Sequence, residues 1–172
     1  MALDMELNQE IEQVKIGIGL EGHEEIIKRL NGLIADEHLL YIKTRNYHWN
    51  VIGPQFSSLH ALFEKQYEEL ASLIDDVAER VRMLGGVAMG TMTQFLEETR
   101  LQEDLPEHWL DARNMVAWLK NDHESLANSL RQDILLSDQY GDVGTADLLT
   151  AVLRWHEKTA WMLRAILTGT AV

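Results

Sequence analysis

The chain has 172 residues, of which 46% are apolar and 25% charged, and its formal net charge is −13. This length suits a single domain with a sizeable core, and the balance excludes a disordered or fibrous protein. The negative charge argues against direct binding to nucleic acid or anionic membranes, and it suits a protein that attracts cations. Without cysteine, a signal-peptide pattern or a long apolar run, we expect a soluble cytoplasmic protein that has no disulfide and does not enter a membrane.

Four long helices are predicted between the few prolines and glycine clusters, at about 24–50, 59–84, 107–138 and 143–167. The second is expected to begin after a cap signal at Ser57 and Ser58. A short helix at 93–99 lies in the long linker between the second and third. This order predicts an all-α four-helix bundle with one long crossover. Residues 1–23 then form an N-terminal extension, mobile or docked on a neighbour, 24–167 the bundle, and 168–172 a short C-terminal tail.

The helix at 59–84 carries an apolar stripe and a separate polar flank. At about 100° per residue, one side of this helix collects the residues expected in the core. They are Leu59, Leu62, Phe63, Leu70, Leu73, Ile74, Val77, Val81 and Leu84. The flank holds His60, Glu64, Asp75 and Glu79 with the small residues Ala71 and Ala78, which would let another helix approach closely.

His60 and Glu64 form one doublet of candidate metal ligands, and Asp75 and Glu79 form another, each with the four-residue spacing that shares a helical face. His60 and Glu79 lie roughly 28 Å apart along the helix, so one chain cannot unite the doublets. However, the outer pair, His60 and Glu79, and the inner pair, Glu64 and Asp75, are centred on the same point of the helix. An antiparallel second copy would set His60 opposite Glu79 and Glu64 opposite Asp75, giving two identical clusters across a two-fold interface. The alternative is that these residues form an ordinary solvated face.

His48, near the end of the first helix, should return close to His60 through the Gly53-Pro54 turn, although it could also be a hydrogen-bonded core histidine. The resulting set of imidazoles and carboxylates without thiolate suits iron, manganese or zinc. No histidine has a Glu three residues before it, which disfavours the Glu-x-x-His di-iron centre of bundles that hold iron within one chain. His123 is expected to face the core.

These residues also resemble a known family. The stretches 46–50 (NYHWN), 56–63 (FSSLHALF), 75–80 (DDVAER), 84–86 (LGG) and 145–147 (TAD) are similar to those of the Dps family, or mini-ferritins. The similarity extends from about residue 26 to residue 167. It implies a ferritin-like bundle in a hollow homododecamer, with ferroxidase sites across two-fold interfaces. Such an enzyme oxidises Fe(II), with hydrogen peroxide or dioxygen, and stores ferric mineral inside the shell.

Carried over by position, His48 and His60 are metal ligands from one subunit, and Asp75 and Glu79 come from its partner. Glu64 stands where the family most often has Asp, which keeps the oxygen donor but adds a methylene. Trp49 and Trp161 match tryptophans thought to intercept one-electron oxidants, and core packing is the alternative role for both.

The acidic residues Asp138, Asp142 and Asp147 resemble those that line the family's three-fold pore, and a solvated loop is the alternative. Val143 and Gly144 replace polar positions common in such pores. Direct DNA binding is not expected, because the first 23 residues carry one basic residue, Lys15, and the C-terminal tail carries none. Two other functions stay open, namely a redox-inert zinc buffer that uses the same ligands and a nucleoid-associated shell that protects DNA.

Overall fold

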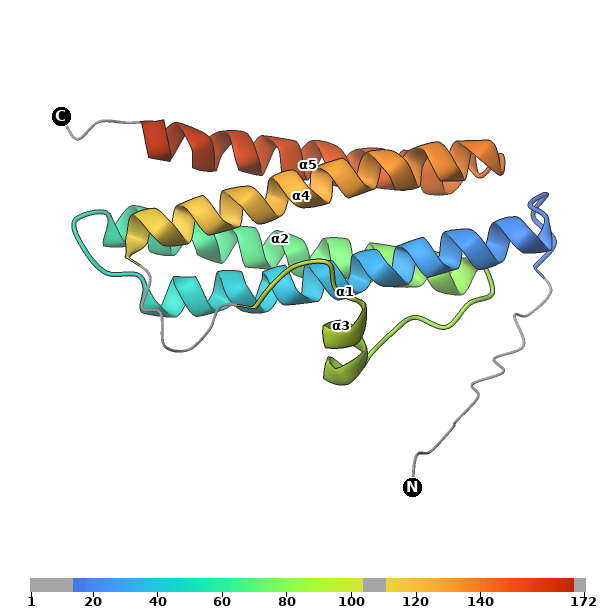
Figure 1. Cartoon of the computed structure of the whole chain (residues 1–172), viewed down its shortest axis with the longest axis horizontal. Helices are drawn as coiled ribbons and strands as arrows, with labels where there is room; N and C mark the ends of the chain where they lie inside the picture. The colour runs from blue at the N-terminus through green and yellow to red at the C-terminus, as the bar shows by residue number, and fades with distance from the viewer. Residues whose placement is uncertain (1–13, 104–110, 169–172) are drawn as a thin grey trace, which may run out of the picture.

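The computed structural model describes residues 14–103 and 111–168, which form five helices and no strand. The long helices are α1 (Leu20–Asn50), α2 (Phe56–Met83), α4 (Ala112–Gln139) and α5 (Val143–Thr168), and the short one is α3 (Met92–Glu98). The α1–α2 and α4–α5 hairpins stack on each other, and α3 packs on α1 within the crossover that runs back along the bundle (Figure 1). The predicted four-helix bundle with an extra helix in the crossover is confirmed. Within the described residues, no helix is both long and apolar enough to span a membrane.

The core follows the predicted stripe of α2. Six of its members are buried, and Leu62, Leu73 and Ile74 are half-buried. The six are Leu59, Phe63, Leu70, Val77, Val81 and Leu84. They pack against apolar residues of α1, α4 and α5, so α2 turns its remaining faces outward.

Helix boundaries differ from the sequence predictions where side chains cap or anchor a terminus. Helix α1 begins four residues early, and His23 in this added turn donates from Nδ1 to the Leu84 carbonyl at 2.8 Å. Helix α2 begins at Phe56, so the predicted cap signal lies inside the helix. Helix α4 begins at Ala112, because Asp111 is extended and accepts a hydrogen bond from the Asn114 amide at 2.8 Å. The predicted helical residues 107–110 lie outside the described part.

The crossover is fastened by Asp36, a fully buried carboxylate of α1. It accepts hydrogen bonds from Thr99 Oγ1 at 3.0 Å, from the Arg100 amide at 2.6 Å and from Arg100 Nε at 2.7 Å. A buried carboxylate requires such partners, since burial without them is strongly unfavourable. This anchor keeps the crossover on the α1 side and leaves the outer flank of α2 uncovered by the described chain.

Candidate metal centre

The predicted approach of His48 to His60 is present at the α1–α2 turn. Gly53, with a φ of 109°, allows the chain to reverse between the two helices. The imidazole rings stack with centroids 3.8 Å apart and planes inclined by 20°. Each ring places its Nδ1 at 2.8 Å from the backbone carbonyl oxygen of the other histidine.

This reciprocal pairing fixes the tautomer of both rings. A carbonyl oxygen only accepts, so both Nδ1 atoms carry a hydrogen, and in the neutral form of each ring Nε2 keeps the lone pair that can bind a metal. A carbonyl partner on the second ring nitrogen is the usual support of a metal-binding histidine, because it orients the ring and raises its basicity. The α1–α2 turn therefore presents two imidazole rings oriented by the backbone, each with its Nε2 turned away from these hydrogen bonds.

The three candidate carboxylates, Glu64, Asp75 and Glu79, are all exposed along α2. Glu64 follows His60 by one helical turn, whereas Asp75 and Glu79 lie near the far end of the helix. Among the described residues of this one chain, no three histidine or acidic side chains are placed to hold a metal ion. The chain thus brings His48 and His60 together and leaves Asp75 and Glu79 roughly 28 Å away along α2.

An aromatic cluster, which the sequence reasoning missed, adjoins the histidine pair. Tyr67 meets the His48 ring edge-on at 5.3 Å, and Phe56 stacks on His60 at 5.0 Å. The Arg45 guanidinium lies over the Tyr67 ring at 5.4 Å. Residue spacing could have predicted this cluster. Arg45 lies three residues before His48 and Tyr67 seven residues after His60, so each shares a helical face with its histidine.

The two tryptophan candidates occupy different surroundings. Trp49 is 63% exposed, and Arg45 lies 5.0 Å above its ring. Trp161 is 58% exposed on α5, with no ring contact to either histidine in the described part of the chain. Neither side chain is a core residue in the single chain.

The three pore candidates differ in their exposure to solvent. Asp138 and Asp147 are exposed, whereas Asp142 is 2% exposed at the start of α5. Its Oδ1 accepts hydrogen bonds from Arg80 Nη2 at 2.7 Å and from the Thr145 amide at 2.9 Å, and its Oδ2 accepts one from Thr145 Oγ1. Asp142 therefore caps α5 and pairs with Arg80 of α2, beside the Glu79 position.

His123 faces the core as predicted, and it belongs to a fully buried line of polar groups. His123 Nδ1 lies 2.8 Å from His156 Nδ1, and His156 Nε2 lies 3.3 Å from Glu37 Oε1. Burial raises the pKa of Glu37, and it lowers that of His123 well below the ordinary value, with a smaller effect from His156. The groups form a line and do not converge on one point, since His156 uses both of its nitrogens. They bond to one another and form no second metal centre.

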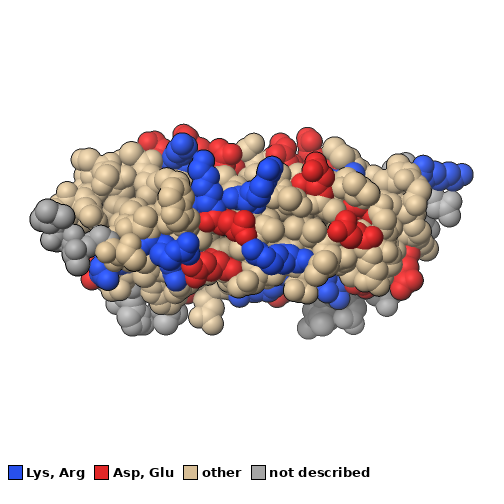
Figure 2. Space-filling model, turned by 90° about the horizontal axis from the view of Figure 1, so that it is seen from above, with Lys and Arg blue, Asp and Glu red and all other residues tan. Residues whose placement is uncertain are grey.

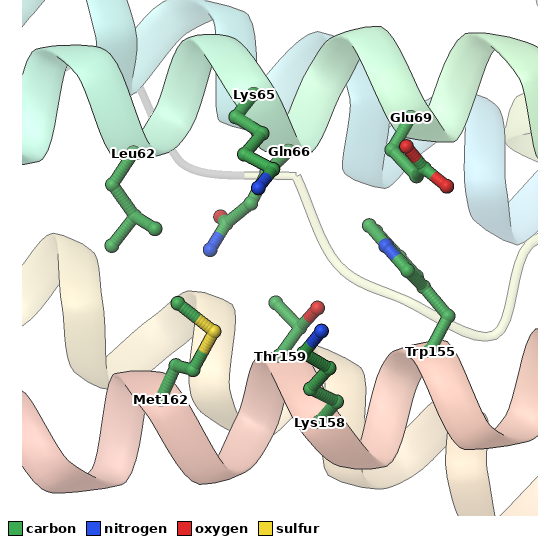
Figure 3. A pocket seen from close by; sticks show the side chains of 8 residues that line it. All are labelled: Leu62, Lys65, Gln66, Glu69, Trp155, Lys158, Thr159 and Met162. Carbon is green, nitrogen blue, oxygen red and sulfur yellow. The ribbon is translucent and has the colours of Figure 1, made fainter.

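A pocket of about 70 Å³ lies between α2 and α5, on the flank of α2 away from the metal-ligand candidates (Figure 3). The Gln66 side chain extends into it from α2 toward α5, and Thr159 and Met162 face it from α5. Gln66 is 4% exposed, and neither of its amide atoms has a hydrogen-bond partner in the described chain. The pocket has room for a few waters and is separate from the histidine pair.

Comparison with known proteins assigns this architecture. The ferritin-like domain family matches residues 27–171, which places the chain among ferritin-like four-helix proteins. The structure superposes on DpsC from Streptomyces coelicolor with a TM-score of 0.90 at 33% identity, over 95% of both chains.

Relatives define the family further. A protein of Bacillus anthracis called DNA protection during starvation protein 2 is 38% identical, over 84% of this chain and 98% of its own. An uncharacterized low temperature-induced protein of Nostoc sp. is 45% identical, over 93% of this chain and 89% of its own. The chain belongs to the Dps family. Members of this family of ferritin-like proteins serve, in general terms, in iron storage and DNA protection.

Proposed function

We propose that this protein is a ferroxidase and iron store in which each catalytic site is shared by two subunits. The observation that carries the proposal is the histidine pair, whose Nδ1 hydrogen bonds leave both Nε2 atoms free to bind metal. Two such nitrogens with carboxylate oxygens suit Fe(II), which takes both donor types. Membership in the ferritin-like superfamily independently implies iron binding.

A two-fold dimer supplies the missing ligands. If α2 packs antiparallel against α2 of a second copy, Asp75 and Glu79 of the partner come opposite Glu64 and His60. The small residues Ala71 and Ala78 on this flank permit the close approach, and Ala71 is exposed in the single chain. The interface would then hold two sites of identical composition, as the symmetry of an isologous contact requires.

Within each site, His48, His60 and Glu79 would hold one Fe(II) firmly, and Glu64 and Asp75 would hold or bridge a second, weaker ion. Two adjacent irons deliver two electrons to one hydrogen peroxide, so O–O cleavage need not release a hydroxyl radical. The protein contributes placement of the ions and charge compensation as Fe(III) forms. Ferric mineral would collect inside a homododecameric shell, and the exposed Asp138 and Asp147 would concentrate Fe(II) at its pores.

Direct DNA binding is not part of this proposal. The face in Figure 2, the upper side of Figure 1, carries Lys and Arg interspersed with Asp and Glu and has no basic stripe. The ion pairs Arg131–Glu157 and Arg164–Glu124 neutralise arginines on α4 and α5. With a net charge of −13 per chain, a phosphate backbone would be repelled. Protection of DNA would then follow from removal of iron and peroxide.

The test is peroxide-driven oxidation by apo-protein loaded anaerobically with Fe(II), followed by ferric absorbance against a protein-free control. We expect rapid oxidation that leaves ferric iron soluble and bound to protein. His60→Ala combined with Glu79→Ala should lower the initial rate by about tenfold or more, since even residues behind a ligand are worth 10- to 100-fold. Glu69→Ala, on the opposite flank of α2, is the matched carboxylate control and should oxidise at the wild-type rate.

An assembled double variant with an unchanged rate would refute the site. No acceleration by the wild-type protein would favour a zinc buffer on the same ligands, and titration calorimetry would then show zinc bound far more tightly than Fe(II). A nucleoid-associated shell would instead reveal itself by a DNA gel shift at physiological salt without added divalent ions.

A further inference from the structure

We propose that the pocket between α2 and α5 is a binding site for a small protonated oxyanion, of which inorganic phosphate is the best fit. The proposal is carried by Gln66, whose side chain extends into this pocket (Figure 3). Gln66 is 4% exposed, and neither of its amide atoms has a hydrogen-bond partner within the described chain. The site lies on a different flank of α2 from the metal-ligand candidates and does not depend on the proposed ferroxidase function.

The Gln66 amide determines what kind of molecule can fill the pocket. A buried amide without partners is unfavourable, because no hydrogen bond compensates the loss of its hydration. Its Nε2 donates and its Oε1 accepts, so an occupant that satisfies both atoms must offer an acceptor and a donor. Thr159 is 5% exposed and faces the same pocket from α5, with a hydroxyl that can play either part. The pocket therefore suits a polar ligand that both accepts and donates hydrogen bonds.

The charges around the pocket select an anion. Lys65 of α2 and Lys158 of α5 line the pocket and extend toward each other across it (Figure 3). Both residues are exposed, and neither forms an ion pair with another described residue. Glu69 is the only acid among the described residues of the lining, so the pocket is locally positive on a chain whose formal net charge is −13. Such a local surplus of positive charge attracts anions and repels cations.

The volume of the pocket limits the size of this anion. A water-sized group needs roughly 10–15 Å³, so a space of about 70 Å³ holds about five such groups. A tetrahedral oxyanion such as phosphate has this size. The apolar side chains of Leu62 and Met162 bound the pocket at one end, and Trp155 and Glu69 bound it at the other (Figure 3). A free oxyanion therefore fills the space between the two lysines and Gln66.

The acceptors in the lining favour phosphate over sulfate. At neutral pH phosphate keeps a P–OH hydrogen, whereas sulfate has none. Gln66 Oε1 and the Glu69 carboxylate can accept this hydrogen, but beside sulfate they would meet only other acceptors. The lysine ammonium groups and Gln66 Nε2 can donate to the remaining oxygens of either anion. A site that pairs a hydroxyl of its ligand discriminates strongly against an analogue without one, so we expect phosphate to bind about tenfold more tightly than sulfate or better.

The experiment titrates the iron-free protein with inorganic phosphate, and in parallel with sulfate, by calorimetry. The ionic strength is held constant with chloride, so that general screening by added salt does not contribute. We expect a single phosphate to bind per chain. Lys65→Met should weaken phosphate binding by about tenfold, because it removes a hydrogen bond between charged groups. Lys28→Met, which changes an exposed lysine of α1, is the matched control and should bind phosphate as the wild type does.

Gln66→Leu tests the residue that carries the proposal. Leucine has a similar volume but neither amide atom, so phosphate binding should again fall by about tenfold. In phosphate-free buffer this variant should be as stable as the wild type or more stable, because it removes a buried polar group that has no partner. Phosphate should raise the urea unfolding midpoint of the wild type, since a ligand of the folded state stabilises it, and should raise that of Gln66→Leu much less.

Three results would overturn the inference. Equal affinity for phosphate and sulfate, or phosphate binding that Gln66→Leu leaves unchanged, would mean that the lysines attract anions without a built site. No binding heat and no change of the wild-type unfolding midpoint would mean that the pocket holds only water. If Gln66→Leu does not fold, Lys65→Met and Lys158→Met at exposed positions still decide, and wild-type affinity in both would refute the site. Because the assay contains no iron, its outcome is independent of whether the protein oxidises Fe(II).

Discussion

Asp142 offers the sharpest test of how the α4–α5 turn is built, because resemblance assigns it to a pore and the structure shows it buried. Asp142→Ala removes a helix cap and the partner of Arg80, a side chain that is only 17% exposed. Loss of an N-cap costs about 1 kcal/mol. A hydrogen bond to a charged group contributes about 1.5–3 kcal/mol. Since both act through Oδ1, they overlap, and we expect a loss of about 2–4 kcal/mol in the free energy of unfolding.

The assay is urea unfolding at one fixed protein concentration, since assembly contributes to apparent stability. Asp147→Ala is the matched control, because Asp147 is exposed on the same helix and should change stability by no more than about 0.5 kcal/mol. Equal, small losses in both variants would refute the assignment of Asp142 as cap and ion-pair partner. A large loss confined to Asp142→Ala would mean that its carboxylate supports the turn and is not free to line a pore.

Two further predictions concern the metal centre and the core. Glu64→Gln should lower the number of Fe(II) bound per site from two toward one in anaerobic titration calorimetry, because an amide lacks the charge of the carboxylate; an unchanged number would exclude Glu64 from the second position. Because burial lowers the pKa of His123 below its unfolded value near 6.5, the unfolded chain binds more protons below that pH, and stability should fall as pH falls. His123→Gln should reduce the fall of the urea unfolding midpoint with falling pH, and an unchanged fall would mean that other groups cause it. The raised pKa of Glu37 acts in the opposite sense, because it favours the folded state as pH falls.

The fold could be predicted because each long helix carries its own apolar periodicity and is separated from the next by glycine or proline. Leu59, Phe63 and Val77 are buried as their helical angle requires. The start of α1 could not be placed from periodicity, because its first turn is fixed by the tertiary hydrogen bond of His23 to Leu84. Local pattern predicts the elements, whereas long-range contacts decide where they begin.

The candidate site shows the same division. Spacing alone predicted that His48 would return to His60, and the structure confirms the approach. The reciprocal hydrogen bonds that fix their tautomers involve backbone carbonyls, which no residue pattern encodes. Likewise, the burial of Asp142 depends on Arg80, sixty-two residues earlier in the chain. Residue types suggested the candidates. Only the three-dimensional contacts show which candidate side chains are exposed and which, like Asp142, already bind a partner within the chain.

On the proposed architecture, Fe(II) oxidation depends on assembly, because each chain holds only part of the ligand set at either end of α2. One end of α2 holds the imidazoles, fixed by the α1–α2 turn, and the other end holds Asp75 and Glu79, beside the Arg80–Asp142 ion pair that fastens α2 to the α4–α5 turn. A single chain then offers iron the two imidazoles and Glu64 at one end of α2 and only Asp75 and Glu79 at the other. Only the two-fold dimer combines them, so Fe(II) oxidation would be confined to the assembled shell that can retain the ferric product.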